Sequence, residues 1–202
     1  MDESTEGVML YARFVLAVRE ACRGMERVCA PVFEMTKHLD EKEPLRRVPI
    51  ALGNDVCQWL EGNLGSAHVR DVGRAIGRSV YRELQKEAVL GPNATPLKVI
   101  EQLTRAAAIV VFDPKGRSFD VLEAVEGRVV VRRGQALNCM LQEGLLAELI
   151  AGTGALNPRA HQVTCTRRDS PHCDYELLWL ARGRSGTFTM PPPSTKLKIP
   201  GR

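Results

Sequence analysis

Long hydrophobic runs are missing from this 202-residue sequence. No stretch approaches the roughly 18 unbroken apolar residues that a membrane-spanning helix needs. The first residues, MDESTEGVMLYARFVLAV, open with acidic side chains and reach Arg13 after one short apolar run, which is not the pattern of a secretory signal peptide. We therefore expect a cytoplasmic protein without a membrane span. In a reducing cytoplasm, cysteines are thiols or metal ligands more often than disulfides.

The sequence also lacks a block of charge of one sign and the common signatures of catalysis. Its 28 Lys and Arg are scattered among 24 Asp and Glu, so nucleic-acid binding is not implied. There is no glycine-rich phosphate loop. No nucleophile has a base at a plausible spacing, because the four histidines are dispersed. These absences favour a protein that is not an enzyme.

Near the N-terminus, apolar residues recur at intervals of three and four. This spacing predicts one long amphipathic helix that ends or kinks at Pro31, within an N-terminal segment of residues 1–45. The stripe either covers the protein's own core or, because it is heptad for more than three repeats, forms the seam of a homodimer. The seam residues would be Val8, Tyr11, Val15, Val18, Cys22 and Met25.

The rest of the chain changes from helical to alternating periodicity. Helices are expected over 54–65, 66–84, 95–112 and 138–154; strands are expected over 118–133 as a hairpin, 160–166 and 173–181. Because this order is not a strict alternation of strands and helices, we predict an α+β domain over residues 46–182, with helices packed on an antiparallel sheet of about four strands. Residues 183–202 would be a proline-rich basic tail.

Two glycines on the second of these helices are expected to have a packing role. Gly73 and Gly77 are four residues apart and so lie on one face of the helix. Each costs about 1 kcal/mol relative to alanine within a helix. The pair therefore predicts the close approach of another backbone or of a ligand.

Three of the six cysteines lie where the predicted elements meet. Cys139 follows Asn138, a good helix N-cap, so its thiolate would be favoured by the first turn of that helix. Cys165 and Cys173 lie near the facing ends of the last hairpin. If the helix packs on the sheet, the three sulfurs converge, and three thiolates with one further ligand make a tetrahedral structural zinc site. Buried free thiols and a Cys165–Cys173 disulfide are the alternatives.

The spacing of these cysteines resembles that of a known family. Gly144 follows Cys139 at five, Cys165 follows Cys139 at 26, and Cys173 follows Cys165 at eight. The pattern is similar to the C-terminal part of 4-vinyl reductase domains. Their fold is shared with small subunits of the TRAPP tethering complex and with the sensor domains of phenol- and xylene-responsive transcription activators. The similarity covers about residues 51–181, with specific motifs in the last third only.

The resemblance implies a structural zinc ion and a small apolar or aromatic ligand held between helices and sheet, with the signal passed to a separate effector protein. Trp59, Tyr81 and Phe112 are the expected lining of that pocket, although the tyrosine that some phenol sensors use is Ala160 here. A TRAPP-like interaction scaffold without ligand, and an accessory protein of tetrapyrrole synthesis, are the alternative functions.

One zinc ligand of the family pattern is changed. Where the family has glutamate, three residues before the second cysteine, this chain has the neutral amide of Gln162. His161 lies four residues from Cys165, so on a regular strand the two face the same side, whereas Gln162 would need a bulge. His161 is therefore the expected substitute ligand, with His172 as second choice.

Overall fold

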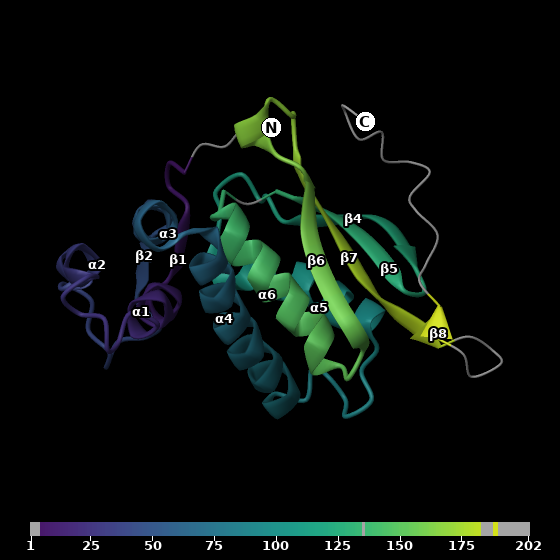
Figure 1. The fold of residues 1–202 in the computed structure, drawn as a ribbon. Coiled ribbons are helices and arrows are strands. Elements are labelled where there is room, and N and C mark those ends of the chain that lie inside the picture. The colour runs from purple at the N-terminus through teal and green to yellow at the C-terminus, as the bar shows by residue number, and fades with distance from the viewer. Residues whose placement is uncertain (1–4, 135, 183–187, 190–202) are drawn as a thin grey trace.

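The computed structural model describes residues 5–134, 136–182 and 188–189 and shows an α+β fold, as predicted (Figure 1). The larger sheet is antiparallel, with the strand order β4-β5-β7-β6 and β8 paired to β7. Its strands are β4 Phe119–Val125, β5 Arg128–Arg133, β6 Leu156–Thr164, β7 Cys173–Arg182 and β8 Phe188–Thr189. The proposed tail 183–202 lies outside the described residues apart from β8.

Four helices follow the predicted pattern closely. They are α3 Ile50–Leu64, α4 Ser66–Lys86, α5 Pro96–Val110 and α6 Cys139–Gly152. Gly65, with φ of 87°, ends α3, and Thr95 accepts a hydrogen bond from the Lys98 backbone N–H at the start of α5. The side chain of Asn138 caps α6 by accepting from the backbone N–H groups of Met140 and Leu141. Only α3 differs appreciably from its predicted bounds: it begins at Ile50, before the expected cap at Asn54.

The prediction of a single long N-terminal helix is wrong. The segment forms β1 Met9–Tyr11, α1 Ala12–Glu20 and, after a turn, α2 Ala30–Thr36. β1 pairs with β2 Arg47–Pro49 and β3 Val111–Phe112 in a small antiparallel sheet. Gly24, with φ of 85°, makes the turn, and Pro31 lies in the first turn of α2 instead of ending a helix.

The interpretation of the N-terminal stripe as a dimer seam is also wrong. Val8, Val15, Val18 and Cys22 are each at most 2% exposed within one chain. They belong to a hydrophobic cluster with residues of α3 and α4, and the half-buried Met25 packs against it. The periodic stripe therefore faces the protein's own core. Tyr11 is half-buried, with Arg13 over its ring.

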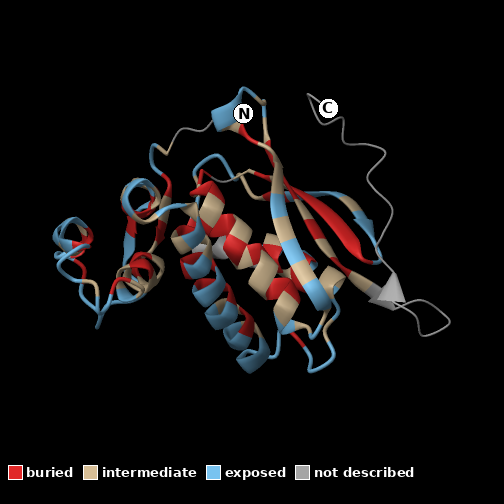
Figure 2. Ribbon diagram, viewed as in Figure 1, coloured by how far each residue is buried: buried red, intermediate tan, exposed pale blue. Residues whose placement is uncertain are grey.

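Helices α4 and α6 lie side by side and separate two hydrophobic clusters (Figures 1 and 2). Gly73 and Gly77 meet the α6 backbone, because a Cβ at either position would overlap the carbonyl oxygen of Leu141 or of Leu145. Gly144 of α6 makes the matching contact with α4, since a Cβ there would overlap the backbone of Arg70. The predicted close approach is confirmed, and its partner is α6.

No described helix combines the length and apolar character that crossing a membrane requires.

Candidate functional site

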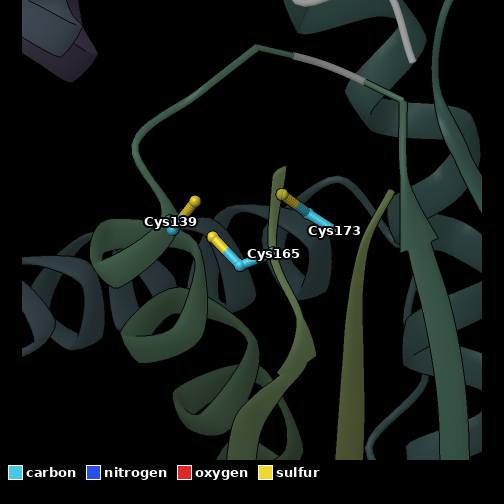
Figure 3. Close-up of side chains that lie close together, drawn as sticks. All are labelled: Cys139, Cys165 and Cys173. Carbon is cyan, nitrogen blue, oxygen red and sulfur yellow. The ribbon is translucent and has the colours of Figure 1, made fainter. Parts of the chain in front are cut away.

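Cys139, Cys165 and Cys173 converge as the sequence predicted (Figure 3). Cys139 is the first residue of α6, Cys165 follows β6, and Cys173 begins β7. The three Sγ atoms all lie within 4.8 Å of one another, and all three residues are buried. They form free thiols, so the Cys165–Cys173 disulfide is not present in this structure. We call this group the cysteine cluster.

A buried arginine, which the sequence analysis missed, holds two of these sulfurs. Arg133 ends β5 and is 3% exposed. Its Nη2 donates to Cys173 Sγ over 3.2 Å and its Nη1 to Cys139 Sγ over 3.6 Å. Arg133 is also paired with Cys173 in the β5–β7 register. The alternation of Val129, Val131 and Arg133 along β5 placed this side chain on the core face and was the available signal.

The surroundings of the cluster stabilise one negative charge on it. A hydrogen bond from Cys173 lowers the pKa of Cys139 to about 5, against the opposing effect of burial, and the positive charge of Arg133 adds to the lowering. The hydrogen bond to Cys139 and burial raise the pKa of Cys173 well above its ordinary value. The backbone N–H of Thr166 donates to Cys173 Sγ over 3.4 Å. Without a metal, the Cys139 and Cys173 thiols therefore lose one proton readily and keep the second.

The bulge that would bring Gln162 to the cluster is present. The β6–β7 register shifts between Gln162 and Thr164, so the side-chain alternation changes before Cys165. Gln162 pairs with the buried Tyr175 and lies against Cys139, where its amide helps to lower the pKa of that thiol. Its Nε2 is buried and has no hydrogen bond of ordinary geometry with any residue that the structure describes.

The prediction that His161 is the substitute ligand is wrong. Its pairing with Glu176 places it on the opposite face of the sheet, where Nε2 lies 3.1 Å from Glu176 Oε2 and half of the side chain is exposed. The regular-strand argument failed because the bulge reverses the alternation between His161 and Cys165. His172 is not part of the metal-binding group found among the described residues.

A carboxylate of α6 supports the bulged backbone. Glu143 Oε2 accepts a hydrogen bond from the Gln162 backbone N–H over 3.0 Å. Its Oε1 is held by Arg70 of α4 at 2.5 Å. The backbone of Gln162 is thus held in place by Glu143 of α6 and, through Glu143, by Arg70 of α4. Such support is expected where a side chain must be presented at a fixed point.

The cluster has the donor set and the spacing of a metal site. In a tetrahedral zinc site with Zn–S near 2.3 Å, the sulfurs are about 3.8 Å apart, which is compatible with the observed separations. Arg133 supplies a positive charge that would offset the excess negative charge of three thiolates around one divalent ion. Cys139, Cys165 and Cys173 are the residues that would hold the ion, and the Gln162 amide lies beside them.

A separate apolar cavity of about 240 Å³ lies next to α6. Its lining comes from β1, α1, α4, α5, β3, β4 and α6, and from the segments beside them. Most of the lining is aliphatic, including Ile76, Leu103 and Leu145. Three charged residues also line it. Arg13 and Glu83 are joined by an ion pair of 2.7 Å and are partly exposed, and Glu87 is exposed, so these residues mark the side of the cavity that faces solvent.

The three aromatic residues expected to line a pocket do not line this cavity. Trp59 packs on the N-terminal hydrophobic cluster. Tyr81 is buried against Gly152, where a Cβ would overlap its ring. Phe112 is 48% exposed, with Arg47 over its ring at 4.8 Å. The prediction was wrong because aromatic residue type does not show which helix face meets the sheet.

No protein-family model matches this chain, and no curated protein matches it in sequence. Solved structures do match in shape. An iron(II) unliganded H-NOX protein mutant from K. algicida is 11% identical, with a TM-score of 0.56 over 84% of this chain and 96% of that chain. The chain has an H-NOX-like fold.

Two further solved structures were compared with this chain. An H-NOX domain mutant from Shewanella oneidensis in the Fe(II)CO ligation state is 12% identical, with a TM-score of 0.51 over 81% of this chain and 97% of that chain. The phenol-responsive sensory domain of the transcription activator PoxR with phenol is 12% identical, with a TM-score of 0.48 over 81% and 94%. At these identities, the likeness to the H-NOX structures concerns the fold.

Proposed function

We propose that this protein is a non-enzymatic sensing module of the 4-vinyl reductase type. It binds a small apolar molecule in the 240 Å³ cavity and passes the signal to a separate effector protein. The observation that carries the proposal is the cavity itself. Apolar cavities of about 150 Å³ already bind benzene, so this one has room for a single ring with a short substituent. The H-NOX-like fold supports the proposal, because fold neighbours include ligand-bound domains.

Haem is not the proposed ligand, although the H-NOX neighbours hold iron(II). Haem iron is held by an axial His, Cys, Met or Tyr. None of these residue types is among the described residues that line the cavity. The ligand class that fits is therefore a compact organic molecule without a metal.

We further propose that the cysteine cluster binds a structural zinc ion. Its support is the convergence of three thiols from separate elements on one point. Zinc there would tie the first turn of α6 to the β6–β7 hairpin. Leu141 and Leu145 of the same helix line the cavity, so the ion would also fix that wall.

Elemental analysis of protein purified without added metal tests this site. We expect about one zinc per chain in the wild-type protein and its loss in Cys165→Ser and Cys173→Ser, because two thiolates hold zinc much less tightly than three. Cys57→Ser is the matched control, since Cys57 is also fully buried but lies outside the cluster. Wild-type protein free of metal would reject the zinc proposal and leave the cavity unaffected.

Filling the cavity tests the sensing function. Ala107 of α5 lines the cavity, and Ala107→Phe would place a ring inside it. We expect the mutation to weaken the binding of acetophenone, a single-ring probe, at least tenfold in calorimetric titration, because probe and side chain compete for one space. Ala67→Phe, an exposed change on α4, should leave binding as in wild type.

Absence of binding to the wild-type protein would favour the scaffold alternative, in which the cavity serves no ligand. The predicted seam no longer supports a homodimer, since Val8, Val15, Val18 and Cys22 are buried within one chain. Dimerisation remains a prediction that the intact native mass would check.

A further inference from the structure

The cavity contains one buried polar side chain that its apolar lining does not satisfy. Gln142 of α6 lines the cavity and is 2% exposed. The sequence analysis missed it, although a glutamine three residues after Cys139 on a mostly apolar helix was a usable signal. Arg13 and Glu83 are partly exposed whereas Gln142 is buried, so the amide lies away from the solvent side of the cavity.

A neighbouring tyrosine contacts the oxygen of this amide. Tyr175 is fully buried on β7, and its hydroxyl contacts both Gln142 Oε1 and the backbone oxygen of Cys139 at 3.3 Å. The amide oxygen of Gln142 shares the single hydroxyl proton of Tyr175 with the Cys139 backbone oxygen. Its Nε2, which carries two N–H groups, has no hydrogen-bond partner among the described residues. Nε2 is not among the fully buried atoms that lack a partner, so it borders space that a small occupant can reach, and an acceptor oxygen placed there would gain a hydrogen bond.

We propose that Gln142 determines ligand specificity by donating a hydrogen bond from Nε2 to an acceptor oxygen at the inner end of the ligand. The inference rests on the proposed ligand-binding function and narrows it to one chemical class. That class is a compact apolar molecule, about one ring in size, with a carbonyl oxygen at the end that enters first. A hydrocarbon of the same shape would fill the cavity and leave the donor unpaired.

The test compares two probes of matched shape. Acetophenone carries a carbonyl oxygen where α-methylstyrene carries a CH₂ group, and both are single rings of nearly the same size. Their dissociation constants are measured by calorimetric titration in the wild-type protein and in Gln142→Met, a change that keeps the side-chain length and removes the donor. The ratio of the two constants cancels the effect of the mutation on the shape of the cavity.

We expect the preference for acetophenone over α-methylstyrene to be about tenfold greater in wild type than in Gln142→Met, as one hydrogen bond to a buried donor implies. A ratio that is the same in both proteins would overturn the role of Gln142 and leave the sensing function standing. If neither probe binds to the wild-type protein, both proposals are rejected.

A measurement on the wild-type protein alone covers the case in which the variant does not fold. The carbonyl stretching frequency of bound acetophenone falls when its oxygen accepts a hydrogen bond. We expect the bound frequency to lie below that of acetophenone in a hydrocarbon solvent. A bound frequency equal to the hydrocarbon value would overturn the proposal.

Discussion

Replacing Gly144 by alanine is expected to destabilise the protein by about 3 kcal/mol or more, since overpacking against a rigid neighbour has a cost of this order. A Cβ at Gly144 would overlap the carbonyl oxygen and Cα of Arg70 on α4. Backbone atoms in the middle of a helix cannot rotate away as a flexible side chain can. The two helices would have to separate, and the contacts of Gly73 and Gly77 with α6 would open as well. Urea denaturation of the two proteins measures the difference.

Gly62→Ala is the matched control. Gly62 is exposed near the end of α3, and a Cβ there would meet no atom within 4 Å. Alanine has a higher helix propensity and restricts the unfolded chain, so this change should stabilise the protein by about 0.5–1 kcal/mol. Similar effects of the two mutations would contradict the close packing of α4 on α6.

The stability of chelator-treated protein is expected to rise with pH between about 5 and 8.5. The pKa of Cys139 is lowered to about 5 in the folded state, whereas an unfolded cysteine has a pKa near 8.5. The unfolded state therefore binds more protons in this range, and stability increases with pH. Each pKa unit corresponds to about 1.4 kcal/mol, so the total gain is on the order of a few kcal/mol. Above pH 8.5 stability should fall, because the pKa of Cys173 is raised in the folded state.

The difference between wild type and Cys139→Ser isolates this effect from other titrating groups. His172, for example, has its pKa lowered by burial and also makes stability rise as pH increases through its titration range. Cys139→Ser should remove most of the rise, whereas Cys57→Ser should keep it. Burial raises the pKa of Cys57 to about 12, so this thiol stays protonated in the folded protein below pH 8.5. Parallel curves for wild type and Cys139→Ser would show that the cluster holds no thiolate.

The elements that the sequence predicted well are those with strong local signals. Asn138 caps α6, Thr95 caps α5, and Gly65 ends α3, because each of these residues satisfies backbone groups or adopts a conformation that others rarely adopt. The hairpin turn at Gly127 belongs to the same group. The N-terminal helix failed because a periodic apolar stripe shows only that one face is buried. It does not show that Met9–Tyr11 pairs as a strand with two distant segments.

By itself, the sequence determined the helices and strands of the central domain, the glycines of a close helix contact and the three cysteines that meet. These features follow from local backbone preferences and from spacing along a single element. Only the tertiary structure decided the fourth side chain at the cluster, since a bulge in β6 turns Gln162 inward and His161 outward. It alone placed Arg133 on the sulfurs and Gln142 in the cavity. The physical reason is that contacts between distant segments depend on sheet register and on helix rotation, which no local pattern encodes.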